Sequence, residues 1–215
     1  MIKDGANNKN IYLFCIVNSI TLGRVPLIIL FINSLTQYLS VKESVYCLGS
    51  IVMSILIIIS DFLDGRLARK YNVTSKMGQV LDIYLDCAYI FAGLITLYVY
   101  DYIYLYFIIV VLYKFLEFII LSKVMKSKIK FKGNKGQDYF YDLLGTIASG
   151  FYYVIPLIVI SLSYLDLIYF QSIINILLAF VTALTVFSSL MKFKNIYKLT
   201  IYKESRERKE NTEAS

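Results

Sequence analysis

Four aspartates gather in one short stretch of the chain, and they are the residues most able to do chemistry. Asp61 and Asp64 stand three residues apart, and Asp82 and Asp86 stand four apart, so each pair shares one face of a helix. Long apolar stretches on both sides place the four carboxylates where two membrane helices approach water. Carboxylates in or next to a membrane segment are energetically costly, and they indicate a functional site.

Small residues lie beside these acids on the same helix faces. Gly65 and Ala68 each follow an acid by four residues, and Gly78 precedes Asp82 by four, so a ligand could approach the backbone closely. Carboxylate oxygens at this density suit a hard divalent cation, Mg²⁺ or Mn²⁺, better than zinc. Carboxylate clusters that hold two such ions serve phosphoryl chemistry. We therefore predict a metal-dependent enzyme that acts on a phosphate or diphosphate at the cytoplasmic face of a membrane.

The elements that position the acids are predicted to be membrane helices. The chain has 215 residues, 58% of them apolar, and a mean hydropathy of +0.65, which is typical of membrane proteins. A spanning helix needs about 20 apolar residues. Six stretches qualify: 11–35, 45–63, 78–100, 102–121, 143–165 and 168–187. These stretches are continuously apolar and do not alternate, which disfavours a barrel, so we predict an all-α integral membrane protein with six transmembrane helices.

Lysine and arginine predict the orientation of these helices. Basic residues gather at the N-terminus, between the second and third stretches, between the fourth and fifth, and after the sixth, whereas the opposite side has Lys42 alone. By the positive-inside rule, both termini and the acids lie on the cytoplasmic side of the cell membrane. Membrane topology and anionic lipid headgroups therefore explain the net charge of +7, and we expect no nucleic-acid partner.

Composition indicates one membrane domain and a short tail. Residues 1–195 are predicted to form the six-helix domain, and residues 196–215 are expected to be a charged, disordered tail, because the part from Glu204 onwards has almost no apolar side chains. The first apolar stretch is too long for a signal-peptide core and lacks a small-residue cleavage site, so we expect a retained helix. The sequence has no histidine, which leaves acid–base work to Asp, Glu, Lys, Tyr or Cys.

The acids and their neighbours resemble the signature of the CDP-alcohol phosphotransferases. Eight positions match in residue type and spacing: Asp61, Asp64, Gly65, Ala68, Arg69, Gly78, Asp82 and Asp86. The motif lies across the second and third predicted helices, and the six-helix length also fits the family. The resemblance implies that a substituted phosphate passes from a CDP-linked donor to an alcohol with release of CMP, in an enzyme that is generally a homodimer.

The resemblance also implies a role for each residue of the motif. Asp86 would reach a metal and act as the general base on the acceptor hydroxyl, and Arg69 would steady the diphosphate or the acids. The other metal ligands would be Asp61, Asp64 and Asp82. The nucleotide pocket would be lined by Gly65, Ala68 and Gly78.

The first predicted helix carries a polar stripe of its own. Asn18, Thr21 and Arg24 stand three residues apart and resemble the Asn-x2-Thr-x2-Arg pattern in the first helix of many family members. A polar seam for helix packing is the alternative interpretation. Because Arg24 lies well inside a span, we favour a substrate-binding role for the stripe, with the donor phosphate or one of the acids as the partner of Arg24.

Three lysines are candidates for holding the acceptor. Lys114 lies three residues before Glu117, so the two could neutralise one another, or Lys114 could contact an anion in the acceptor pocket. Lys132 and Lys135 belong to a basic run that fits the positive-inside rule, but they could also hold a phosphorylated acceptor.

The acceptor is the least determined part of the reaction. Cys87 stands where synthases of phosphatidylglycerophosphate and of inositol lipids often have a basic residue. We favour a phosphatidyltransferase that uses CDP-diacylglycerol, with glycerol 3-phosphate as its acceptor and serine, inositol or another alcohol as alternatives. Two other classes are weighed. An intramembrane prenyltransferase usually has a different Asp spacing, and an ion-binding transporter more often shows broken helices and repeated halves.

Overall fold

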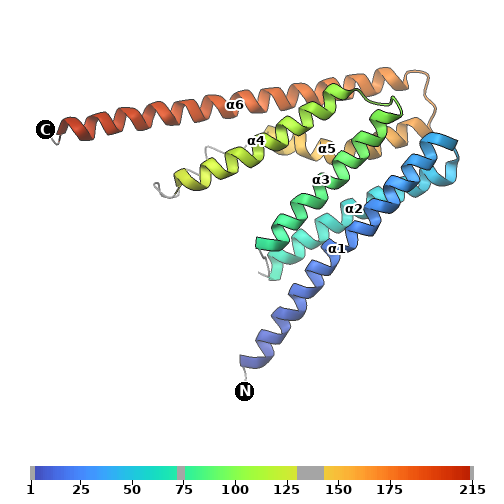
Figure 1. Ribbon diagram of the computed structural model, residues 1–215, viewed down its shortest axis with the longest axis horizontal. Helices are drawn as coiled ribbons and strands as arrows, with labels where there is room; N and C mark the ends of the chain where they lie inside the picture. The colour runs from blue at the N-terminus through green and yellow to red at the C-terminus, as the bar shows by residue number, and fades with distance from the viewer. Residues whose placement is uncertain (1–2, 72–75, 130–142, 214–215) are drawn as a thin grey trace. The chain divides into compact units, whose positions relative to one another are not determined.

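Six α-helices and no strands make up the part of the chain that the computed structural model describes, which is residues 3–71, 76–129 and 143–213 (Figure 1). In chain order they are α1 (Lys3–Val41), α2 (Ser44–Tyr71), α3 (Lys76–Val99), α4 (Leu105–Ile129), α5 (Leu143–Tyr164) and α6 (Phe170–Glu213). Each helix covers most of one predicted apolar stretch, so the all-α prediction is confirmed. All of them except α5 also extend past these stretches, because hydropathy marks only the part of a helix that lies in lipid.

The chain divides into two compact units. Unit 1 comprises Met1–Leu105 and Tyr152–Ile174, and so contains α1, α2, α3, the second part of α5 and the first residues of α6. Unit 2 comprises Tyr106–Phe151 and Asn175–Ser215, and so contains α4, the first part of α5 and the rest of α6. The helices that carry the four acids and the polar stripe of α1 therefore belong to the same unit.

Five helices of the described chain hold segments long and apolar enough to cross a membrane. The segments are Thr21–Val41, Ser44–Arg66, Val80–Val99, Leu144–Tyr164 and Phe170–Lys194. Large apolar side chains stay exposed on these segments, for example Val45 at 73% and Ile176 at 71%. A soluble domain rarely leaves so much apolar surface open to water, whereas lipid accommodates it. The protein is therefore a multi-pass membrane protein.

The fourth predicted span, 102–121, is helical from Leu105 onwards, in α4, but α4 is not among those five segments. Its apolar stretch runs into residues whose side chains lie outside the described part of the chain. The count of six spans and the cytoplasmic position of both termini therefore stay predictions.

Tight turns join the helices at one end of unit 1. Lys42, Asp101 and Asp166 each follow a helix and adopt left-handed backbone conformations, with φ of 64°, 62° and 46°. A left-handed residue just after a helix is a common way to end it. The hydroxyls of Ser40 and Tyr100 lie 2.7 Å apart, which ties the end of α1 to the end of α3. We call this the turn end of unit 1.

Aromatic packing joins α1, α3 and α5 within unit 1. The Tyr89 ring lies 5.1 Å from the Phe31 ring and 5.0 Å from the Tyr153 ring, measured between centroids. One turn further along α3, a Cβ added to Gly93 would lie 3.0 Å from the Cγ atom of Pro156. Glycine is needed at this point because it lets the proline ring of α5 approach the α3 backbone. The helix faces around the acids are fixed by this packing.

The C-terminal tail differs from its prediction. The segment 196–213 was expected to be disordered, whereas the structure continues α6 as one helix to Glu213. Lysine, arginine and glutamate dominate this segment, and all three have high helix propensity. A charged, solvated helix can therefore continue from a membrane-spanning one without a core of its own.

Candidate functional site

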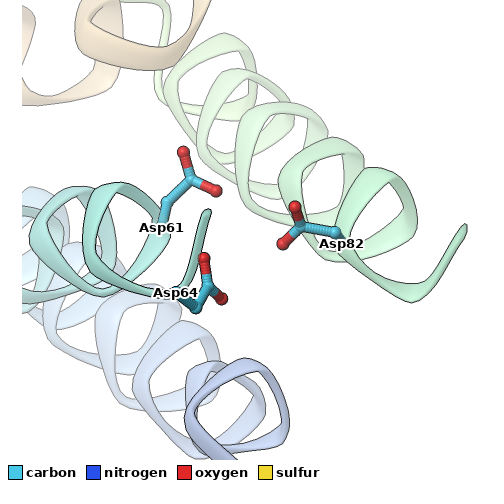
Figure 2. Close-up of side chains that lie close together, drawn as sticks. All are labelled: Asp61, Asp64 and Asp82. Atoms are coloured by element: carbon cyan, nitrogen blue, oxygen red, sulfur yellow. The ribbon is translucent and has the colours of Figure 1, made fainter. Parts of the chain in front are cut away.

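The four aspartates of the motif lie on α2 and α3, and we call them the acid cluster. Figure 2 shows the side chains of Asp61 and Asp64, from α2, close to that of Asp82, from α3. Each of these three residues offers a carboxylate oxygen within 4.8 Å of the other two. The predicted convergence of the two acid-bearing helix faces is confirmed for these three residues.

Arg24 of α1 lies at the centre of the acid cluster and pairs with all four carboxylates. One terminal nitrogen, Nη1, lies 3.1 Å from Asp61 and 3.0 Å from Asp86. The other, Nη2, lies 2.6 Å from Asp82 and also donates to Asp64. The arginine side chain is fully buried, so its charge has no solvent to neutralise it and depends on these acids. Asp86 thus joins the cluster through Arg24.

Burial separates one acid from the other three. The Asp64 side chain is only 3% exposed and accepts a hydrogen bond of 2.9 Å from the Thr21 hydroxyl. The side chains of Asp61, Asp82 and Asp86 are between 31% and 36% exposed. A ligand can therefore reach three of the carboxylates, whereas that of Asp64 is buried against α1.

The cluster fits a divalent cation. One buried oxygen of Asp64, Oδ1, has no hydrogen-bond partner among the residues that the structure describes. A buried carboxylate oxygen without a partner is costly, and a coordinated cation would satisfy it. Arg24 supplies a single positive charge to four carboxylates, so the ionised cluster keeps a net negative charge that a cation can neutralise. Oxygen ligands of this kind favour Mg²⁺ or Mn²⁺.

The position of the cluster along the helices places it near a membrane surface. Arg24, Asp61 and Asp82 each lie about 17 residues from the turn end of their helix, which is about 25 Å at 1.5 Å per residue. The hydrocarbon core of a bilayer is about 30 Å thick. If the turn end lies at one surface, the acids therefore lie close to the other, where a water-soluble substrate can meet a lipid.

The structure describes the burial of only some of the remaining motif residues. Gly65 and Gly78 lie in α2 and α3, and both are half-buried. Asn18, Ala68 and Arg69 lie in α1 and α2, but their side chains are outside the described part of the chain. The predicted nucleotide pocket therefore stays a prediction at these positions.

Lys114 belongs to a different group of charges, in unit 2. Its ammonium lies 3.1 Å from the Glu117 carboxylate and 2.7 Å from the Ser188 hydroxyl. Glu117 also accepts a hydrogen bond from Ser189 and lies 3.4 Å from the Lys192 nitrogen. The predicted Lys114–Glu117 pair is confirmed, and it links α4 to α6. An acceptor contact by Lys114 stays a prediction, and Lys132 and Lys135 lie outside the described residues.

We expect this α4–α6 charge group to support folding. Glu117→Ala would leave Lys114 and Lys192 without their shared carboxylate, and Glu117 is only 6% exposed. Removal of one partner from a buried ion pair typically costs about 3–5 kcal/mol. The melting temperature of the purified protein in detergent should fall accordingly. The double variant Lys114→Met with Glu117→Gln should recover much of the loss, and an unchanged melting temperature in Glu117→Ala would contradict this role.

Sequence reasoning missed Tyr153 of α5. Its ring packs 5.0 Å from that of Tyr89, which lies one turn after Asp86 on α3, so α5 also contributes to the surroundings of the acid cluster. The chain has 20 tyrosines, and none of them stands at a spacing that distinguishes it from an ordinary core or interfacial residue. Only the packing of α5 on α3 singles Tyr153 out.

Comparison with known proteins agrees with this geometry. A family model described as CDP-alcohol phosphatidyltransferase matches residues 14–187 of the chain, which confirms the resemblance drawn from the acids. A CDP-diacylglycerol–glycerol-3-phosphate 3-phosphatidyltransferase of Aquifex aeolicus (strain VF5) is 34% identical over 67 residues. That similarity covers 31% of this chain and 36% of the relative, so the chain matches about a third of that relative's length.

Proposed function

The chain belongs to the CDP-alcohol phosphatidyltransferase family, and from this membership we propose that it transfers a phosphatidyl group from CDP-diacylglycerol to an alcohol and releases CMP. The observation that carries the proposal is the convergence of Asp61, Asp64 and Asp82 around Arg24, near one end of membrane-spanning helices. A lipid-linked donor needs a charged site at the membrane surface, and this cluster supplies it.

Divalent ions belong to the proposed reaction. Asp61, Asp64 and Asp82 would hold them, with Asp86 reaching the same site, and two ions of Mg²⁺ or Mn²⁺ fit four carboxylates. When bound, such ions stabilise the charge on the attacking and leaving oxygens of an in-line phosphoryl displacement. Gly65 and Gly78 leave space beside the acids for the nucleotide.

Two residues of the protein then have separate roles in the reaction: Asp86 in proton transfer and Arg24 in the stabilisation of charge. Asp86 accepts the proton of the acceptor hydroxyl while the acceptor oxygen forms a bond to the phosphorus that carries the diacylglycerol group. The bond from that phosphorus to the oxygen bridging the two phosphates breaks, and CMP leaves with the electron pair. Arg24, fully buried among the acids, stabilises negative charge that develops on the phosphate oxygens.

Glycerol 3-phosphate is the acceptor we favour within the family. Support comes from the Aquifex aeolicus relative, whose name states this acceptor and whose similarity to this chain is 34% over 67 residues. Serine, inositol and other alcohols are the alternatives, because Cys87 departs from the basic residue that often follows the last aspartate in such synthases.

An acceptor panel tests this choice. Purified protein in detergent with CDP-diacylglycerol and Mg²⁺ would be incubated separately with glycerol 3-phosphate, serine, inositol, inositol phosphate and ethanolamine, and the lipids identified by mass spectrometry. We expect phosphatidylglycerophosphate, with glycerol 3-phosphate alone active. A different phospholipid would reassign the acceptor within the family, and no new lipid with any acceptor would overturn phosphatidyl transfer.

The cellular setting completes the proposal. We place the protein in the cell membrane with the acid cluster at the cytoplasmic face, because most lysines and arginines lie on the side of the acids. A homodimer is the assembly that family membership suggests. The protein would then take its lipid donor from the bilayer and its alcohol from the cytoplasm.

A further inference from the structure

Three buried hydroxyls in unit 1 lack a hydrogen-bond partner among the residues that the structure describes. They are Ser54 Oγ on α2, Tyr89 OH on α3 and Tyr153 OH on α5. Most buried polar groups in proteins are hydrogen-bonded, and one left without a partner costs stability. Each of the three hydroxyls therefore needs an explanation.

Tyr153 differs from the other two in what surrounds it. The Tyr89 hydroxyl lies beside Ser54, so these two groups can serve one another after a small rotation. The Tyr153 ring instead packs 5.0 Å from that of Tyr89, which follows Asp86 by three residues and so shares its face of α3. Its hydroxyl is thus a buried polar group at the edge of the acid cluster, with no protein partner in the described chain.

Packing holds the Tyr153 ring in place. The ring lies 5.0 Å from that of Tyr89, which is itself fully buried and lies 5.1 Å from Phe31. One turn further along α5, Pro156 packs closely against Gly93 of α3. A hydroxyl on a ring fixed in this way loses little entropy when it binds a ligand, which is the property of a preorganised site.

We propose that Tyr153 binds the acceptor alcohol, donating a hydrogen bond to its reacting oxygen and orienting that hydroxyl towards Asp86. The proposal rests on the phosphatidyl transfer proposed above. A phenol is neutral and can both donate and accept hydrogen bonds, so it suits an alcohol better than a diphosphate. The diphosphate needs positive charge, and Arg24 supplies that on the α1 side of the acids.

Tyr153→Phe tests this role, with Tyr89→Phe as the matched control. Both changes remove one buried hydroxyl and keep the ring, but the Tyr89 hydroxyl has Ser54 beside it. In wild type and both variants, the initial rate of CMP release would be measured against acceptor concentration and, separately, against CDP-diacylglycerol concentration. Melting temperatures would be measured on the same preparations.

We expect kcat/KM for the acceptor to fall about 3- to 10-fold in Tyr153→Phe, as for the loss of one hydrogen bond, while the donor KM stays within about twofold. The melting temperature should stay the same or rise, because the variant loses a hydroxyl without a partner, whereas a merely structural hydrogen bond would lower it. Tyr89→Phe should leave both kinetic constants unchanged.

Two results would overturn the inference while the proposed function stands. One is an unchanged acceptor kcat/KM in Tyr153→Phe, and the other is a donor KM that rises in this variant as much as the acceptor KM, each measured beside an active wild type. A wild-type protein that releases no CMP with any acceptor would overturn the proposed function, and the role of Tyr153 with it.

Discussion

Asparagine in place of Asp86 should reduce CMP release by about 100- to 10,000-fold and leave donor binding largely intact. Asp86 is the proposed base for the acceptor hydroxyl, and a positioned general base typically contributes a factor of this size. An amide can still accept the hydrogen bond of 3.0 Å that Arg24 donates, so the cluster keeps its arrangement. Asp61, Asp64 and Asp82 remain to hold the metal. CMP release and the shift in melting temperature on addition of CDP-diacylglycerol measure the two effects separately.

Asp101→Asn is the matched control for this variant. Asp101 is exposed, lies at the turn end of unit 1 and has a left-handed backbone that asparagine also adopts readily. It should show wild-type rates and wild-type donor binding. Full activity in Asp86→Asn would remove Asp86 from the mechanism. A loss of activity accompanied by a complete loss of donor binding would instead make Asp86 a binding residue.

Glutamine in place of Arg24 should destabilise the metal-free protein by about 3–5 kcal/mol. The substitution removes the one positive charge that pairs with four carboxylates, and Asp64 among them is buried. Uncompensated charges away from water carry a penalty of this size. Because a divalent cation can replace the lost charge, Mg²⁺ alone should raise the melting temperature of Arg24→Gln more than that of wild type. CMP release should also fall, since the charge of the arginine stabilises the reacting phosphates in the proposed mechanism.

Arg66→Gln provides the comparison for Arg24. Arg66 lies near the same end of α2 as the acids, but its side chain is exposed and lies over the Phe62 ring. Its replacement should change stability by less than about 1 kcal/mol, with no special response to Mg²⁺. Equal Mg²⁺-induced shifts in wild type and Arg24→Gln would contradict the view that arginine and cation neutralise the same carboxylates.

The sequence predicted the acids of the site better than their surroundings. Spacing alone placed Asp61 with Asp64 and Asp82 with Asp86, because i, i+3 and i, i+4 pairs always share a helix face. The two faces were expected to meet because a metal site would need it, and three of the acids do meet. The partner of Arg24 was left open between the donor phosphate and an acid. Its position among all four acids depends on how α1 packs against α2 and α3, which no local pattern records.

Contacts between distant segments explain what the sequence left out. Lys114 and Glu117 are three residues apart and were visible as a pair, but Ser188 and Lys192 lie on another helix and carry no sign of their partner. Tyr153 is one tyrosine among 20, and only its packing on Tyr89 brings it to the face of α3 that carries Asp86. The helical continuation of α6 was missed because low hydrophobicity was taken to indicate disorder, although Lys, Arg and Glu also favour helix.

The acid cluster is proposed to carry out phosphatidyl transfer with divalent cations. The decisive experiment is release of CMP from CDP-diacylglycerol by the purified protein, measured with glycerol 3-phosphate in Mg²⁺ and again with excess EDTA. We predict steady release in Mg²⁺, none in EDTA, and recovery when Mg²⁺ or Mn²⁺ is restored. Release that continues unchanged in EDTA would rule out metal-dependent transfer, and a protein that binds neither metal nor donor would rule out the proposed site.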